Sequence, residues 1–277
     1  MKLIVTHLSV DLDAIASVWL IRRFLPGWDE AEYAFVPAGK TYQNKTPDAD
    51  QDVIHTDTGV GRFDHHQTNT RTSATKLVLD FLLKKKHVKD KNREPLERMV
   101  DVINETDHFG EIDFPEPTAD RYEFFLTQII DGLKPILQDD LKTMNLVLVL
   151  LDGVFLEFKN KVQAEEEIKN GFVFTSYFGR SLVLESKNEE VVKLALKMGY
   201  RLVARRDPAR RFIRIKTKPL KEIDLTAVYK KIIKMDPKAT WFLHVSKHML
   251  LNGSAKNPDA IASSLTLQQL IAILKDV

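Results

Sequence analysis

The first hundred residues alternate between short apolar runs and longer stretches of helical period. The runs typical of buried strands lie over residues 2–8, 31–37 and 52–57. The helical patterns lie over residues 14–25, 73–86 and 94–105, and Pro26-Gly27 ends the first of them. Strands that alternate with helices predict an α/β fold, with a parallel sheet that carries helices on its faces.

The pattern becomes almost wholly helical from about residue 119 to residue 170. The last part of this stretch, residues 159–170, is polar and charged, and Gly171 follows it. We interpret it as a link between two domains. The expected domains are residues 1–155, with a helical linker to about residue 170, and a smaller α/β domain over residues 171–277.

The pattern after Gly171 predicts two hairpins and three helices. The hairpin strands are expected over residues 172–177 and 181–185, around Gly179, and over residues 201–206 and 211–218, around Asp207-Pro208. Helices are expected over residues 188–198 and 225–234, with a strand over residues 241–245. The last helix is expected to begin with a capping box of Thr266 and Gln269.

Composition narrows the class of protein. Hydrophobic residues make up 44% and charged residues 29%, which is typical of a soluble globular protein. The net charge of +2 gives no chain-wide preference for nucleic acid or membrane. The absence of cysteine excludes disulfides and thiolate metal sites and fits a reducing cytoplasm. The N-terminus lacks a signal-peptide pattern, and the apolar run over residues 145–158 is too short to span a bilayer, so we expect a cytoplasmic protein.

Residues suited to metal binding gather in the first domain. They are His7, Asp11 and Asp13, Asp57, Asp64-His65-His66, and Asp107 with His108. The first group lies at the C-terminal end of the first predicted strand and Asp57 ends another, at the edge where open α/β sheets bind ligands. Carboxylates mixed with imidazoles suit Mn²⁺, Fe²⁺, Co²⁺ or Zn²⁺ better than Mg²⁺. So many carboxylates repel one another unless cations neutralise them, and the number of ligands is enough for two ions.

This combination of motifs resembles the DHH phosphoesterase superfamily. That group includes RecJ-type exonucleases, oligoribonucleases, cyclic-dinucleotide phosphodiesterases and family II inorganic pyrophosphatases. Four motifs stand in the family's order within roughly the first 110 residues. They are His7-x-x-x-Asp11-x-Asp13, Asp57, Asp64-His65-His66 and Asp107. The resemblance implies an N-terminal parallel-sheet domain with metals at its edge, a smaller C-terminal domain, and an active site in the cleft between them.

The resemblance also implies a role for each matching residue. The ligands of the first ion would be His7 and Asp11, and those of the second would be Asp13, His65 and Asp107. Asp57 would bridge both ions, Asp64 would orient its neighbours through hydrogen bonds, and His66 would face the substrate phosphate. A hydroxide held between two divalent ions would attack phosphorus. Mn²⁺ is the favoured ion, with Co²⁺ and Mg²⁺ as alternatives.

The function expected from these residues is hydrolysis of phosphodiester or phosphoanhydride bonds. The substrate would be a nucleotide, a short oligonucleotide or a polyphosphate, as in exopolyphosphatase-related proteins, with no membrane partner and with a homodimer left open. One alternative is a non-catalytic nucleotide-binding or sensor protein on the same fold. Another is a phosphatase that uses Asp11 as a covalent nucleophile, although the neighbouring histidines and Asp57 favour metal-dependent chemistry.

Three of these residues have simpler interpretations. An Asp-x-Asp motif before a helix is usually a helix N-cap, and Asp13 is a candidate cap of the first helix. His55 is expected to belong to the strand before Asp57 rather than to the site. His108 is either a ligand or a hydrogen-bond partner.

Candidate substrate-binding residues lie in the second domain. The segment over residues 201–218 is rich in arginine, and Arg206, Arg211 and Arg214 are the candidates for phosphate contacts. A solvated strand face is the alternative. Residues 251–264 are expected to form a loop that carries Lys256 to an anion, with a plain surface turn as the alternative. The chain lacks the Gly-Gly-Gly-His pattern of the oligoribonucleases and a clear Ser-Arg-Lys pattern of the pyrophosphatases, so the motifs select neither substrate.

Overall fold

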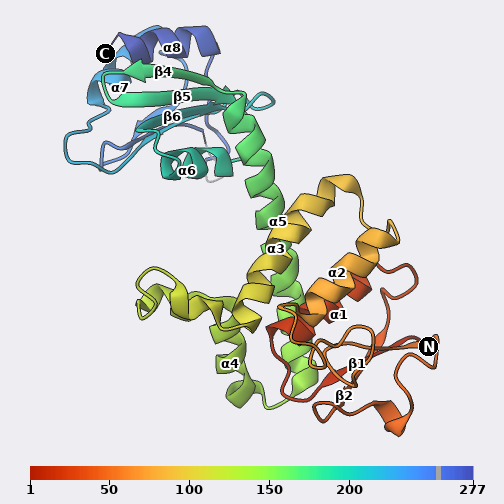
Figure 1. Cartoon of the computed structure of the whole chain (residues 1–277). Coiled ribbons are helices and arrows are strands. Elements are labelled where there is room, and N and C mark those ends of the chain that lie inside the picture. Colours follow the sequence, from red (N-terminus) through yellow and green to blue (C-terminus); the bar gives the residue numbers. More distant parts are fainter. Residues whose placement is uncertain (254–256, 277) are drawn as a thin grey trace. The chain divides into compact units, whose positions relative to one another are not determined.

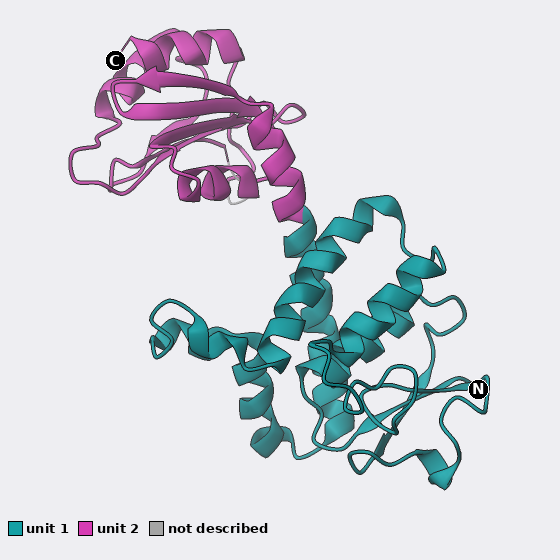
Figure 2. Ribbon diagram, viewed as in Figure 1, with its two compact units in different colours: residues 1–159 teal, residues 160–277 magenta. Residues whose placement is uncertain are grey.

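The computed structural model describes residues 1–253 and 257–276. The chain divides into two compact units, Met1–Lys159 and Asn160–Val277, which Figure 2 colours separately. Helix α5, Asp140–Lys169, runs through the point of division (Figure 1). Among the described residues, no helix is both long enough and apolar enough to cross a membrane.

Unit 1 contains a parallel sheet of three strands in the order β2-β1-β3. The strands are β1 (Leu3–His7), β2 (Glu32–Val36) and β3 (Val53–His55). His7 pairs with Val36 in register, and Val5 pairs with His55. Because all three strands run in the same direction, the residues that follow them meet at one edge of the sheet. The predicted parallel sheet is therefore present.

Helices pack against this sheet and against one another. They are α1 (Leu12–Phe24), α2 (Ala74–Lys84), α3 (Asp90–Asp107), α4 (Leu126–Leu137) and α5, with short 3-10 helices at Tyr42–Asn44, Gly110–Asp113 and Asp120–Phe124. The region after residue 119 is not one continuous helix. Phe125 is extended before α4, and Gln138 adopts a left-handed φ of 50° that separates α4 from α5. The apolar pattern alone did not show these two interruptions.

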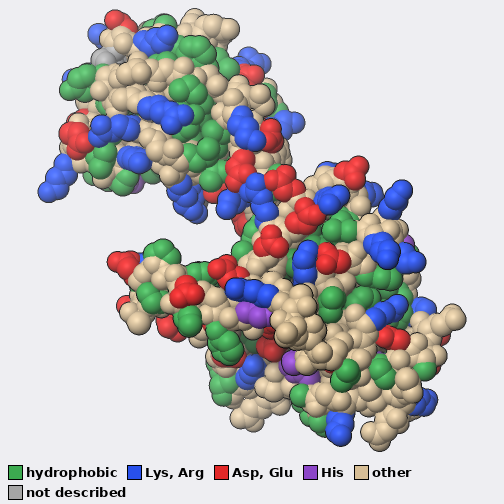
Figure 3. All heavy atoms as spheres, in the orientation of Figure 1, with side chains coloured by type: hydrophobic (Ala, Val, Ile, Leu, Met, Phe, Trp, Pro, Cys, Tyr) green, Lys and Arg blue, Asp and Glu red, His purple; other side chains and the backbone are tan. Residues whose placement is uncertain are grey.

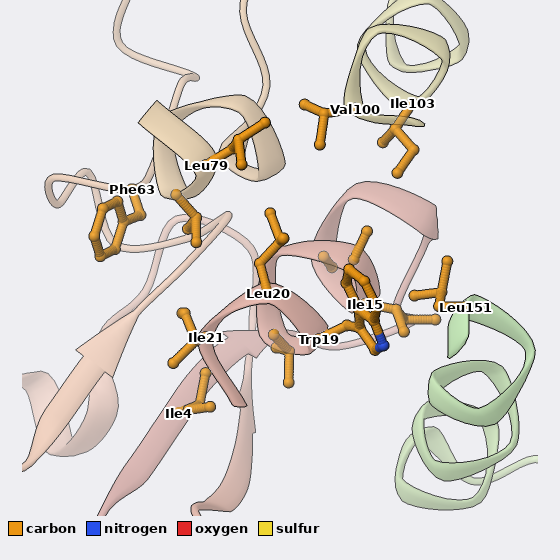
Figure 4. Close-up of a cluster of buried hydrophobic side chains, with 14 of the residues drawn as sticks. Ile4, Ile15, Trp19, Leu20, Ile21, Phe63, Leu79, Val100, Ile103 and Leu151 are labelled. Carbon is orange, nitrogen blue, oxygen red and sulfur yellow. The ribbon is translucent and has the colours of Figure 1, made fainter. Parts of the chain in front are cut away.

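The core of unit 1 is built around α1. This helix is buried from Asp13 to Ile21, since it lies among the sheet, α2 and the later helices. Figure 4 shows side chains of α1 with Ile4 from the sheet, Leu79 from α2 and Leu151 from α5 around them. The start of α1 is therefore held rigidly, which matters because two of the candidate ligands lie there.

Unit 2 is a six-stranded sheet with helices. The strand order is β4-β5-β6-β7-β9-β8, and only β5 and β6 pair in parallel. The strands are β4 (Phe172–Ser176), β5 (Gly179–Glu185), β6 (Leu202–Arg206), β7 (Ile213–Thr217), β8 (Trp241–Leu243) and β9 (Met249–Asn252). The helices are α6 (Glu190–Lys197), α7 (Thr226–Met235) and α8 (Leu267–Lys275), and α8 begins with the capping box of Thr266 and Gln269.

The expected loop over residues 251–264 is partly wrong. Its first residues belong to β9, which lies between β7 and β8. The side chain of Asn252 is fully buried, donates to the carbonyls of Thr240 and Ile261 (both 2.9 Å) and accepts from the Ser263 amide (2.8 Å). It therefore holds the chain in place. Lys256 lies outside the described residues.

Candidate metal centre

The loop after β1 carries the first candidate ligands to the sheet edge. Its backbone is fixed by Asp140, whose carboxylate accepts hydrogen bonds from the amides of Ser9 (3.0 Å) and Val10 (3.1 Å). Asp11 then caps α1 by accepting from the Ala14 amide at 3.0 Å. These contacts hold Asp11 beside His7, whose Nε2 lies 3.5 Å from the Asp11 carboxylate.

Asp13 is not the cap of the first helix, because Asp11 takes that place. Asp13 is buried in the first turn of α1 and faces the N-terminus of α2. Its two carboxylate oxygens accept from the amides of Ala74 (2.7 Å) and Thr75 (2.9 Å). The carboxylate thus satisfies free amides of α2. Each oxygen keeps a further lone pair, so this structural role is compatible with binding a cation.

Asp57 follows β3 and has an unusual backbone. Its φ of 55° is left-handed, a conformation that aspartate and asparagine tolerate better than most residues. Its amide donates to the carbonyl of Phe63 at 2.9 Å, which closes a turn and returns the chain to the sheet edge. The carboxylate, in a residue only 3% exposed, lies 3.2 Å from His7 Nε2 and 3.4 Å from His65 Nε2.

Asp64 and His66 form a hydrogen-bonded pair at the end of this turn. Asp64 is buried and accepts from the amides of Val60 (2.7 Å) and His66 (3.0 Å). It also accepts from Nδ1 of His66 at 2.7 Å. The side chain of His66 is 64% exposed, so its Nε2 is left for another partner. In Figure 3, histidine side chains reach the surface of unit 1 beside acidic and basic ones.

The structure brings all six predicted metal ligands together. Three groups have ligand atoms within 4.8 Å of one another, namely His7 with Asp11 and Asp57, Asp13 with His65 and Asp107, and Asp57 with His65 and His66. His65 Nε2 lies 3.7 Å from a carboxylate oxygen of Asp13 and of Asp107. Within the described part of the chain, His55 and His108 belong to none of these groups. His55 instead ends β3 and accepts from the Tyr42 amide at 3.0 Å.

The donor atoms fit divalent cations. An oxygen of Asp57 and an oxygen of Asp107 are buried and make no hydrogen bond within the described residues. His7 donates its Nδ1 proton to the carbonyl of Leu8 at 2.8 Å, which leaves Nε2 for a ligand bond. Buried polar atoms without partners are rare in proteins. Here such atoms lie close together among carboxylates and imidazoles, and a bound cation would give them a partner.

Burial and charge shift the pKa values of the cluster in opposite directions. Burial, and then the charges of Asp57 and Asp107, raise the pKa of Asp13 to about 7. Burial alone would raise the pKa of Asp57 too, but His65 and His7 outweigh it and lower this pKa to about 2. Burial would lower the pKa of His7, but Asp11 and Asp57 raise it to about 11. The Asp57 carboxylate, 3.4 Å from Nε2 of His65, is the main cause that raises the pKa of His65 to about 9.

We expect the affinity for Mn²⁺ to rise as pH increases from about 6 to about 8, because metal ligands must be deprotonated. With raised pKa values, His7 and His65 are protonated at neutral pH and must lose their protons on binding. Calorimetric titrations in two buffers of different ionisation enthalpy measure both the affinity and the proton release. An affinity that does not change with pH, together with no proton release, would contradict this ligand set.

The arginines predicted to bind substrate do not form one basic surface. Arg205 pairs with Arg214 in register and Arg206 with Ile213, so Arg206 and Arg214 lie on opposite faces of the sheet. Arg206 is paired with Glu185, and Arg214 contacts Glu189 at 2.7 Å. Arg211 is exposed in the turn between the strands, with a left-handed φ of 58°. Alternation along the strands could have separated Arg206 from Arg214 before the structure was known.

Residues 4–158 match the family model described as ChrB, C-terminal domain. The chain belongs to the ChrB C-terminal domain family. The match covers more than half of the chain, with almost all of unit 1 and every candidate metal ligand inside it. Unit 2 lies beyond the matched residues. A search of curated proteins gives no match.

Three solved structures of differently named proteins are similar to the chain. One is the DHH domain of a member of the s1p family of ribosomal proteins, with 10% identity and a TM-score of 0.33 over 99% of this chain and 86% of that chain. Another is RecJ from Thermus thermophilus with Mg²⁺, with 10% identity and a TM-score of 0.35 over 99% of this chain, which spans about half (49%) of RecJ.

The third is an exopolyphosphatase-related protein from Bacteroides fragilis, with 12% identity and a TM-score of 0.29 over 99% of this chain and 90% of that chain. Because the TM-scores are low, the function proposed below rests on the residues of this chain and not on these structures.

Proposed function

We propose that the chain is a divalent-metal-dependent phosphohydrolase that cleaves phosphodiester or phosphoanhydride bonds. The observation that carries the proposal is the position of Asp57, whose carboxylate lies 3.2 Å from His7 Nε2 and 3.4 Å from His65 Nε2, between the ligands expected for the two ions. Two ions bound there would activate water and offset the charge on phosphoryl oxygens. Mn²⁺ suits this mixture of oxygen and nitrogen donors better than Mg²⁺ does.

The chain's own residues then supply orientation and a hydrogen-bond donor. Asp64 accepts the Nδ1 proton of His66 and fixes the ring with its exposed Nε2 towards the substrate. A ring that also carries a proton on Nε2 would donate it to a phosphoryl oxygen or to the leaving oxygen. Such carboxylate–imidazole pairs set both the tautomer and the orientation of the ring. We therefore assign substrate contact to His66 and positioning to Asp64.

Replacing Asp64 by asparagine should lower kcat roughly 10- to 100-fold, the usual cost of losing such a support. KM and the affinity for Mn²⁺ should change much less, because His66 acts on the substrate and Asp64 is in none of the groups that could hold an ion. Asp64→Glu, which keeps the charge, should recover part of kcat. Equal losses of kcat and of Mn²⁺ affinity would mean that Asp64 supports the metal ligands instead.

A substrate screen tests the proposed activity itself. The panel is pyrophosphate, polyphosphate, dinucleotides, cyclic dinucleotides and bisphosphorylated nucleosides, each supplied with Mn²⁺ and followed by product release. We expect hydrolysis of at least one compound. A folded protein that binds Mn²⁺ but cleaves none of them would contradict the proposal and favour a binding or sensor role.

A further inference from the structure

Two cavities open beside the candidate metal ligands, and their linings have opposite character. The first, of about 230 Å³, is lined by apolar and neutral polar residues together with five acidic ones, namely Asp11, Asp13, Asp107, Glu111 and Asp131. The described residues that line it include no lysine, arginine or histidine. The second, of about 410 Å³, is lined by His65, Thr68, Asn69, Thr70, Arg71 and His108, with no carboxylate among these described residues. Bound cations would neutralise the metal ligands in the first cavity but not Glu111, whereas the second cavity carries the positive charge of Arg71 and attracts a further phosphate.

Arg71 provides the positive charge of the second cavity. Its guanidinium forms no hydrogen bond or ion pair with any residue that the structure describes, and the residue is exposed. Arg206 and Arg214 differ in this respect, because glutamates already neutralise both. A guanidinium presents five N–H donors in a planar fork that matches phosphate oxygens.

The loop that carries Arg71 is anchored at both ends to candidate metal ligands. At its start, the Thr68 amide donates to the carbonyl of His65 at 3.1 Å. At its end, the Ala74 amide donates to Asp13 at 2.7 Å. Between them, the hydroxyl of Thr68 donates to that of Thr70 at 3.0 Å and accepts from the Thr70 amide at 3.1 Å. The position of Arg71 is thus tied to the metal centre.

His108 completes the lining on the side of α3. Its Nδ1 donates to the carbonyl of Asn104 at 2.8 Å, so Nε2 is left for another partner. The centroid of its ring lies 6.3 Å from that of His65, which is itself a candidate ligand. The cavity therefore begins at the metal centre and extends from it among imidazole, hydroxyl, amide and guanidinium groups.

We propose that this cavity is a subsite for a second phosphate group of the substrate, held by Arg71. The inference rests on the proposed function and narrows its substrate class to compounds that carry another phosphate next to the bond that is cleaved. Because Arg71 lies in the second cavity, the substrate binds in one direction, with its additional negative charge towards this residue. The phosphate-binding arginine is thus in unit 1, where the sequence pattern did not indicate one.

Binding of phosphonates that cannot be hydrolysed tests the subsite without turnover. The probes are methylenediphosphonate, which has two phosphoryl groups, and methylphosphonate, which has one, titrated calorimetrically into Mn²⁺-loaded protein. Arg71→Ala should weaken binding of the diphosphonate by about tenfold or more, the loss expected for a charged hydrogen bond. Binding of methylphosphonate and of Mn²⁺ should change little. The affinity of Arg71→Lys for the diphosphonate should lie between those of the wild type and Arg71→Ala, because lysine keeps the charge but lacks the planar fork of N–H donors.

Arg93→Ala is the matched control, because it removes another exposed arginine, whose partner is Glu97 on α3. It should bind both probes as the wild type does. Unchanged diphosphonate binding in Arg71→Ala, or no binding of either probe by the wild type, would overturn the subsite. If Arg71→Ala weakens diphosphonate binding but the wild type hydrolyses nothing, the subsite stands and the proposed function fails. If the wild type turns over substrate but Arg71→Ala binds normally, the function stands and the subsite fails.

Discussion

Asp57→Asn should lower turnover by roughly a thousandfold or more, comparable with removing a principal electrostatic stabiliser. The carboxylate belongs to two of the groups that could hold an ion, so one substitution weakens both. With its pKa lowered to about 2, Asp57 is ionised at any working pH, and the variant removes a full charge. Asparagine also tolerates the left-handed φ of 55°, so the fold should survive.

Asp80→Asn is a matched control for this variant. Asp80 is a half-exposed aspartate on α2 whose partner is Lys76, so the same chemical change occurs away from the centre. Both variants should give the circular dichroism spectrum of the wild type, and only Asp57→Asn should lose activity and Mn²⁺ affinity. If Asp57→Asn kept the turnover of the wild type, Asp57 could not be the residue that two ions share.

Removing divalent ions should abolish turnover entirely. Without a cation, Asp13, Asp57 and Asp107 repel one another. This repulsion, together with burial, raises the pKa of Asp13 to about 7. Chelation should therefore also lower the Tm of the protein, because a ligand that binds only the folded state stabilises it by mass action. Returning Mn²⁺ or Co²⁺ should restore more activity than returning Mg²⁺.

The change of Tm with Mn²⁺ distinguishes a variant that has lost a metal ligand from one that no longer folds. Asp57→Asn should show little increase of Tm with Mn²⁺, whereas Asp80→Asn should respond as the wild type does. Full turnover in metal-free buffer with a chelator present would exclude metal-dependent chemistry. A Tm that no divalent ion changes would show that the cluster does not bind these ions in the folded state.

The positions of the candidate ligands could be predicted because they depend on short segments. His7 ends β1 and Asp57 follows β3, and parallel strands end at one edge, so the pattern of apolar runs was enough to bring them together. The neighbours Asp64, His65 and His66 needed only a turn that returns to this edge. These contacts arise from the order of strands and helices, which apolar periodicity indicates directly.

Other features depend on contacts that no local pattern carries. Asp140 holds the amide of Ser9 from 131 residues further along the chain, and nothing around Asp140 indicates this partner. No local pattern favours Arg71 over Arg214 as a phosphate ligand, because only the folded chain shows that Arg214 is paired with Glu189. Residue 251 was expected in a loop because Gly, Asn, Ser and Pro are frequent in the segment that it begins, yet pairing with β7 and β8 makes it a strand.

Titrating Mn²⁺ into metal-free protein while recording electron paramagnetic resonance spectra tests the dinuclear centre most directly. If Asp57 joins two ions, the wild type should bind two Mn²⁺ per chain and give the spectrum of an exchange-coupled pair. Asp57→Asn should lose the coupling. A single bound Mn²⁺, or two that give only uncoupled signals, would contradict a centre in which Asp57 is shared.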